Sequence, residues 1–330
     1  MRLVLALIAA LVAAVPASAQ EAGHDQRPSG DSAFRAEVQE SLHGAEVPAS
    51  EGQKDMIMPH IVDAHAIEIP WPNAALSKHI ELPRWEPIHV GGLTIDLSPT
   101  KHVIMMLVAA TLAFLLLFLA GRAQRRYQAE GKPPKGVPNA VEAIVLYMRN
   151  EVVLPNVGAH GERYVPFVLT LFFFILFANV LGLVPYGSTA TSNISVTATL
   201  AIITFFVIEW AGMRALGKGY LGTIVYWPHD MPIALKLPMT LIMTPVEIIG
   251  KLTKPFALAI RLFANMTAGH VMVLALIGMI FTFGSWWVVG GPFLMAVGIM
   301  LLELFVAFLQ AFIFAMLASV FIGQIREAAH

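Results

Sequence analysis

Residues 255–270 read Pro-Phe-Ala-Leu-Ala-Ile-Arg-Leu-Phe-Ala-Asn-Met-Thr-Ala-Gly-His, and this stretch decides how the rest of the chain is interpreted. Its one arginine, Arg261, lies in an apolar run that continues to Ile280. At the centre of a bilayer such a residue costs roughly 2.5–3.5 kcal/mol or more. A cost of this size predicts a partner for the guanidinium or a function that needs it.

A helix through this stretch, at about 100° per residue, brings Glu247, Lys254 and Asn265 close to the face of Arg261. Alanines occupy the same stripe, and side chains this small let another helix come close. His270 points to the opposite side. The helix is therefore predicted to present a permanent charge to one neighbour and a titratable group to another. The alternative is that Arg261 snorkels to the interface or pairs locally with a carboxylate.

The composition indicates a polytopic membrane protein. Of the 330 residues, 57% are hydrophobic and only 13% are charged, which is too apolar for a soluble domain of this size. The net charge of −1 gives no reason to expect a nucleic-acid partner. Cysteine is absent, so disulfides and cysteine-ligated metals are excluded. No cofactor and no metal site are expected, because the histidines of the N-terminal region are irregularly spaced.

The N-terminal 100 residues are predicted to lie outside the cytoplasm. Residues 1–19 combine Arg2, a short apolar run and Ala17-Ser18-Ala19, which is typical of a cleaved signal peptide; an uncleaved anchor is the alternative. Residues 20–100 then form an extracytoplasmic extension, flexible as far as residue 80, with a short helix around Phe34–Leu42. The alternation over Ile88–Leu97 predicts a strand or hairpin.

The rest of the chain, 101–330, is predicted to be an all-α membrane domain with about five crossing helices. Arginines and lysines follow the first span directly, which puts the mature N-terminus outside and the C-terminus in the cytoplasm. An amphipathic helix over residues 138–154 is predicted to lie on the cytoplasmic membrane surface. The first three spans are predicted at His102–Ala120, Pro166–Leu183 and Ile194–Met213.

The last two helices are predicted to be too long to stand upright in a bilayer. The pattern Thr244-Pro245-Val246-Glu247 indicates a helix start, and that helix would run to about Thr282. The second would run over Pro292–Gln324, after a turn at residues 284–291. At 1.5 Å per residue they measure ~54 Å and ~48 Å against a ~30 Å hydrocarbon core. The two helices are therefore predicted to form a steeply tilted antiparallel pair, of the kind that could wrap a curved partner.

One histidine, one acid and one amide of this pair are the remaining candidates for chemistry. His270 and Glu303 are about equally far from the predicted turn, so they are expected at similar depth and as partners. Gln310 follows Glu303 by seven residues and shares its face.

The motif R-L-F-A-N-M-x-A-G, preceded by K-P-x-x-L, resembles subunit a of the F-type ATP synthase, and the resemblance covers roughly residues 88–325. It implies a non-catalytic, proton-translocating stator subunit that offers two aqueous half-channels to a rotating ring of c subunits. The implied partners are this ring, b-type peripheral stalk subunits and the F1 ATPase head, in the bacterial cell inner membrane.

The resemblance also implies roles for single residues. Arg261 would face the ring carboxylate, with Asn265 and Gln310 orienting its guanidinium, and His270 with Glu303 would pass protons in from outside. Glu209 and Glu247 are candidates for the cytoplasmic exit. The family often has Thr-x-Asp-x-Asn before the third span; here residues 191–195 lack the acid, which puts a proton-carrying role there in doubt.

Two other classes of function remain open at this point. A stand-alone proton or cation channel, or an antiporter, would use the same buried charges, although no inverted repeat with paired broken helices is visible. A membrane scaffold or an intramembrane hydrolase is the other class, although no H-E-x-x-H or G-x-S-x-G motif occurs.

Overall fold

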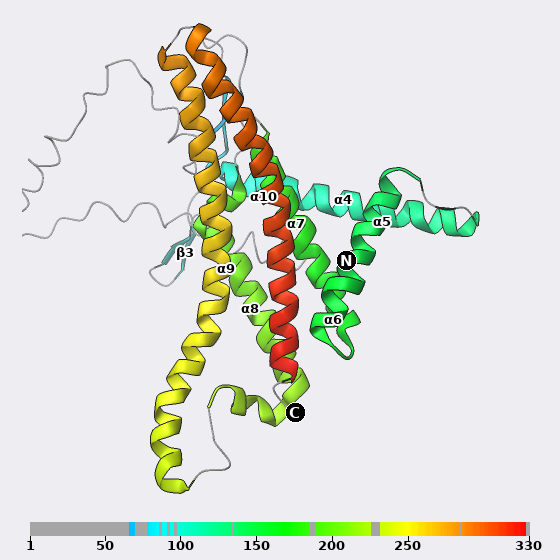
Figure 1. Ribbon diagram of the computed structural model, residues 1–330, viewed down its shortest axis with the longest axis vertical. Coiled ribbons are helices and arrows are strands. Elements are labelled where there is room, and N and C mark those ends of the chain that lie inside the picture. Colours follow the sequence, from blue (N-terminus) through cyan, green and yellow to red (C-terminus); the bar gives the residue numbers. More distant parts are fainter. Residues whose placement is uncertain are drawn as a thin grey trace, which may run out of the picture.

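The computed structural model describes residues 66–69, 78–85, 88–90, 93–95, 98–131, 133, 135–184, 189–225, 232–283 and 286–327. The predicted signal peptide and the predicted helix at Phe34–Leu42 lie outside these ranges. Figure 1 shows the described part as a set of long helices, with short strands such as β3 lying beside them.

Two short hairpins precede the helices. β3 (Ile88–Val90) pairs antiparallel with β4 (Leu93–Ile95), which confirms the hairpin predicted there. β1 (Ala66–Ile69) pairs with β2 (Lys78–Glu81), in a region where the sequence analysis predicted only flexible chain. That prediction was wrong here because the alternation of apolar and polar residues lasts only four residues in each strand, too few to stand out as a period.

The helical part begins with α4 (Lys101–Ala129), α5 (Val137–Tyr147), the π-helical segment η3 (Met148–Val153) and α6 (Leu154–Val157). The 3₁₀ segment η4 (Gly161–Arg163) leads to α7 (Val165–Leu183), and η5 (Ala190–Ser192) leads to α8 (Ile194–Leu216). After η6 (Gly217–Thr223) come α9 (Ile233–Phe283) and α10 (Trp286–Glu327). Five helices in these ranges are long and apolar enough to cross a membrane, which agrees with the all-α polytopic class predicted above.

The helix start predicted at Thr244–Glu247 is wrong, because α9 begins at Ile233 and contains Pro238, Pro245 and Pro255. A proline costs one backbone hydrogen bond. Residues 233–243 are mostly apolar, however, and in lipid a bent helix costs less than an irregular segment whose backbone groups have no partners. The helix therefore continues through Thr244–Glu247 and does not begin there.

The predicted turn at residues 284–291 is also too long, since α10 already begins at Trp286. Glycine and proline, which suggested a turn, are common inside membrane helices. The surface helix predicted over 138–154 likewise runs further, from Val137 through η3 to Val157. Pro155 is tolerated in the first turn of α6, and the chain breaks only at Gly158, with φ of 73°.

The last two helices lie side by side and run in opposite directions (Figure 1). With 51 and 42 residues they span ~77 Å and ~63 Å at 1.5 Å per residue. Figure 1 also shows α4 crossing this pair at a steep angle, so α4 and the pair cannot all be parallel to a membrane normal. This arrangement agrees with the strong tilt predicted from helix length.

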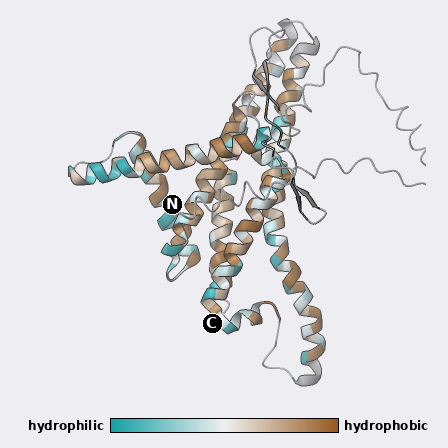
Figure 2. Cartoon of the chain, turned by 180° about the vertical axis from the view of Figure 1, so that it is seen from behind, coloured by the Kyte–Doolittle hydropathy of each residue, from teal (hydrophilic) through white to brown (hydrophobic). Residues whose placement is uncertain are grey.

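A large part of the core lies where α7 packs against α10. Phe172, Leu171 and Ile175 of α7 are fully buried. They meet a stripe of fully buried alanines on α10, at Ala307, Ala311, Ala315 and Ala318. Small side chains at this spacing let the two helix backbones approach closely. Figure 2 shows apolar residues along the helices and hydrophilic ones gathered at the far end of α4 and near the C-terminus.

The C-terminal end of α10 is fixed to the segment between α6 and α7. The guanidinium of Arg326 donates a hydrogen bond to the carbonyl of Val157 at 2.8 Å and lies over the ring of Tyr164. Gly323 packs against the carbonyl of Asn156, where any side chain would collide. The surface helix and the C-terminus, which the sequence analysis placed on one side of the membrane, therefore lie at the same end of the molecule.

Candidate functional site

The structure brings His270 of α9 and Glu303 of α10 together, as their distance from the turn predicted. His270 Nδ1 lies 3.4 Å from Glu303 Oε1, and both side chains are mostly buried. Gly269 makes this approach possible, because a Cβ at that position would collide with Glu303 Oε1. Apart from this ion pair, Glu303 Oε1 has no hydrogen-bond partner in the described part of the chain, so the carboxyl keeps capacity for a further proton or ligand.

The other ring nitrogen of His270 contacts a residue that the sequence analysis did not name. Thr189 stands just before η5, is buried to 1% exposure, and places its Oγ1 against His270 Nε2. No sequence pattern marks this threonine, since it lies in a connection between two helices. Only the packing of η5 against α9 brings it to the site.

A second layer of polar groups supports this position. Asn179 of α7 is fully buried; it accepts a hydrogen bond from Thr191 Oγ1 at 2.7 Å and donates one to the carbonyl of Ala307 at 3.3 Å. The amide thus ties η5 to the backbone of α10. Because a buried amide must be hydrogen-bonded, Asn179 fixes the distance between the two elements that carry Thr189 and Glu303.

Arg261 lies two to three turns from His270 along α9 and is exposed. Among the described residues no hydrogen bond or ion pair engages its guanidinium. Asn265, one turn further and also exposed, donates to Gln310 Oε1 at 3.2 Å, while Gln310 is buried to 3% exposure. The predicted grouping of Asn265 with Gln310 is thus present beside Arg261. Local pairing of Arg261 with a carboxylate of this chain is not seen in the described ranges.

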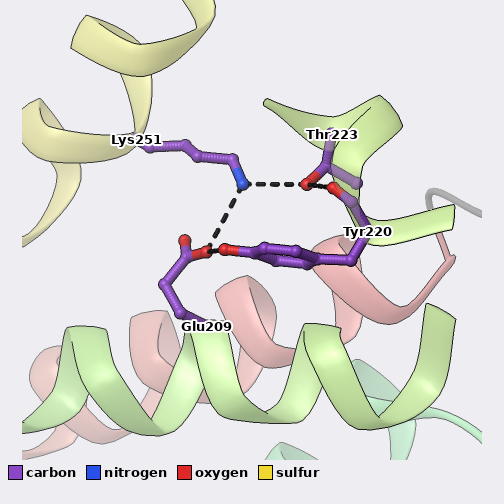
Figure 3. A network of polar contacts seen from close by, with 4 residues as sticks. All are labelled: Glu209, Tyr220, Thr223 and Lys251. Atoms are coloured by element: carbon purple, nitrogen blue, oxygen red, sulfur yellow. Dashed lines mark hydrogen bonds and ion pairs between the residues drawn. The ribbon is translucent and has the colours of Figure 1, made fainter. Parts of the chain in front are cut away.

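Glu209 of α8 belongs to a second polar cluster, together with Lys251 of α9. Lys251 is about as far from Arg261 along α9 as His270 is, in the other direction. Lys251 Nζ lies 3.4 Å from Glu209 Oε2 and 2.9 Å from Thr223 Oγ1. The hydroxyl of Tyr220 donates to the same carboxylate oxygen, and the ammonium lies 4.9 Å from the Tyr220 ring centroid. Figure 3 shows Lys251 reaching from α9 into this group, with Glu209 on α8 and the other two on η6.

The sequence analysis missed Lys251, although a lysine one turn after Glu247 in an apolar helix is the signal that could have marked it. Glu247 itself is exposed and is not drawn into the cluster. Lys254 also lies outside this cluster. It donates to Gln324 Oε1 at 3.2 Å, and its ammonium lies 4.9 Å from the Phe321 ring centroid. Within the described ranges no group of three or more His, Cys, Asp or Glu side chains is arranged to hold a metal ion.

Comparison with known proteins shows the family of this chain. The family described as ATP synthase A chain matches residues 103–323. ATP synthase subunit a of Anaeromyxobacter dehalogenans strain 2CP-1 is 44% identical over 274 residues, covering 81% of this chain and 68% of the relative. ATP synthase subunit a 2 of Chlorobium luteolum is 42% identical over 327 residues, covering 96% of this chain and 83% of the relative. The chain therefore belongs to the ATP synthase A chain family.

Proposed function

We propose that this chain is the stator subunit that offers two separate proton half-channels to a rotating ring of c subunits, and that Arg261 separates them. The observation that carries the proposal is the order of groups along α9. The His270 cluster lies nine residues after Arg261 and Lys251 lies ten before it. At 1.5 Å per residue, these spacings are ~14 Å and ~15 Å, so the two clusters do not meet.

The exposed guanidinium supports a partner outside this chain. Arg261 lies on a face with Ala257, Ala264 and Ala268, all exposed, so a partner helix can approach closely. A charge in apolar surroundings needs an opposite charge, and a carboxylate on the ring would supply it. A guanidinium stays protonated when desolvated, so it attracts a deprotonated carboxylate without carrying protons itself.

The cluster around His270 and Glu303 would serve the half-channel open to the outside. An imidazole can accept and release a proton near neutral pH, and Glu303 lies within reach of Nδ1. Asn265 and Gln310 would orient or hydrate Arg261, to which they lie next. Glu247, exposed, and Glu209, held by Lys251 and Tyr220, would line the exit toward the cytoplasm.

The remaining parts of the proposal follow from topology and from the family. The mature N-terminus, after a signal peptide at residues 1–19 and within the extension over 20–100, would lie outside the cytoplasm, and the C-terminus would lie inside. The membrane domain, 101–330, would sit in the bacterial cell inner membrane against the c ring, with b-type stalk subunits and the F1 head completing the complex. The chain itself would be non-catalytic.

Purification of the tagged full-length chain from its own membranes tests this proposal. A ring of small hairpin subunits and a soluble ATPase head should copurify with it, and ATP hydrolysis should acidify inverted vesicles that contain this assembly. If the chain is instead purified alone and conducts protons in vesicles that lack a ring, the hypothesis of a stand-alone channel is correct.

A further inference from the structure

We propose that Thr189 is a positioning residue for proton transfer, which holds the His270 ring and serves both of its protonation states. This inference rests on the function proposed above for His270 and Glu303. It concerns a residue that lies outside the motifs on which the family resemblance rests.

The contacts hold the imidazole at both nitrogens. Nδ1 faces Glu303 Oε1 at 3.4 Å, and Nε2 contacts Thr189 Oγ1 on the other side of the ring. With both nitrogens held, rotation of the ring would break two interactions at once. Without Thr189, the ring would be held only by Glu303, whose own charge changes whenever it takes part in transfer.

A hydroxyl group suits the position beside His270 Nε2 better than a group that can only donate or only accept a hydrogen bond. Neutral His270, with its proton on Nδ1 facing Glu303, needs a donor at Nε2. Protonated His270 needs an acceptor there. A threonine hydroxyl supplies both, because it carries one O–H donor and two lone pairs and rotates freely about its C–O bond. The ring can therefore gain or lose a proton without losing its second partner.

Neighbouring residues hold Thr189 in place, although it lies in the connection between α7 and η5. Its carbonyl accepts hydrogen bonds from Ser192 N at 3.0 Å and Ser192 Oγ at 2.7 Å. Gly182 of α7 provides the space, since a Cβ there would lie only 2.6 Å from Thr189 Cβ. The bond from Thr191 to Asn179 ties the following residues to α7. A glycine and three hydrogen bonds thus fix the backbone from which this hydroxyl extends.

The test uses Thr189→Val, which keeps the shape but removes the hydroxyl, and Thr189→Ser, which keeps the hydroxyl. ATP-driven acidification of inverted vesicles is measured with the amount of assembled complex quantified. Loss of one hydrogen bond should lower the rate in Thr189→Val about fivefold. Thr189→Ser should stay within about twofold of the unmodified protein, since a hydroxyl can still serve both states.

Thr204→Val is the matched control, because Thr204 is equally buried, at 1% exposure, and its hydroxyl only donates to the carbonyl of Leu200 in its own helix. Its pumping should be unchanged. Equal losses in Thr204→Val and Thr189→Val, or in Thr189→Ser and Thr189→Val, would overturn the proposal. If His270→Ala stops pumping while Thr189→Val pumps normally, only the role of Thr189 fails. If His270→Ala pumps normally, the proposed function of the pair fails and the role of Thr189 fails with it.

Discussion

The two polar clusters on α9 differ in how completely their groups are paired. In the cluster of Glu209 and Lys251, the ammonium has a carboxylate, a hydroxyl and an aromatic face, and the carboxylate also accepts from Tyr220. In the cluster of His270 and Glu303, the closest ion-pair distance is 3.4 Å and a carboxylate oxygen lacks a hydrogen bond from the described residues. The first has little left to bind, whereas the second keeps an open position.

This difference indicates different uses for buried charge. A fully paired cluster is stabilised in one arrangement and resists rearrangement, so it suits the task of holding α9 against α8. A cluster with spare capacity has an atom free to bind another proton or donor. Between the two stands Arg261, whose partner is not found among the described residues of this chain. Substitutions at these three kinds of charge should therefore differ in the size of their effects.

The largest effect is expected at Arg261. Arg261→Gln and Arg261→Lys should both abolish ATP synthesis and ATP-driven pumping, because neither offers a permanent planar cation to a ring carboxylate. Arg261→Gln should also leak more protons than Arg261→Lys, since it removes the charge that separates the half-channels. Decay of a pH gradient in vesicles with the assembled complex measures the leak. Near-normal pumping in Arg261→Gln would contradict the proposed function.

The next largest effect is expected at the open cluster. Replacing His270 or Glu303 with Ala should severely reduce proton-driven ATP synthesis while the complex still assembles. The exchange variant, His270→Glu with Glu303→His, should recover part of the activity, because the pair keeps its position when its members change helices. If the exchange variant is no better than the worse single variant, the two residues do not act as a coupled pair.

A smaller effect, first of all on stability, is expected at the closed cluster, which also contains Glu209 of the proposed proton exit. Lys251→Met leaves the mostly buried carboxylate of Glu209 without its cation and should lower the free energy of unfolding by about 1–3 kcal/mol. Adding Glu209→Gln should restore part of this loss, since the unpaired charge is then gone. Thermal unfolding of the purified complex measures both. A double variant less stable than Lys251→Met alone would show that the pair is not what holds α9 to α8.

The smallest effect is expected at an exposed ion pair. Arg149 Nη2 lies 2.7 Å from Glu162 Oε1, but the side chains are 39% and 72% exposed. Water and salt screen such a pair, so Arg149→Ala should change the free energy of unfolding by only about 0.5 kcal/mol. The same thermal unfolding assay provides the comparison. A loss as large as that of Lys251→Met would mean that distance alone, without burial, sets the strength of these contacts.

Much of the site follows from sequence because helical geometry carries it. The pairing of His270 with Glu303 was predicted from equal distances to a turn. The pair forms in the structure although α10 begins six residues earlier than predicted and α9 ends only one residue later. The grouping of Asn265 and Gln310 beside Arg261 follows from the same register. The apolar runs likewise determined the membrane helices, because their length and composition admit few other structures.

Other features depended on tertiary packing. The start of α9 was misplaced because local capping residues compete with the need of an apolar segment for backbone partners, and the second effect is the larger in lipid. Thr189 and Lys251 acquire their contacts from elements distant in sequence, 81 and 42 residues away respectively. The sequence by itself determined which groups lie on each face of α9. The partner that each face meets was decided only when η5, η6, α8 and α10 closed around it, because a contact between distant segments depends on the packing of the whole chain.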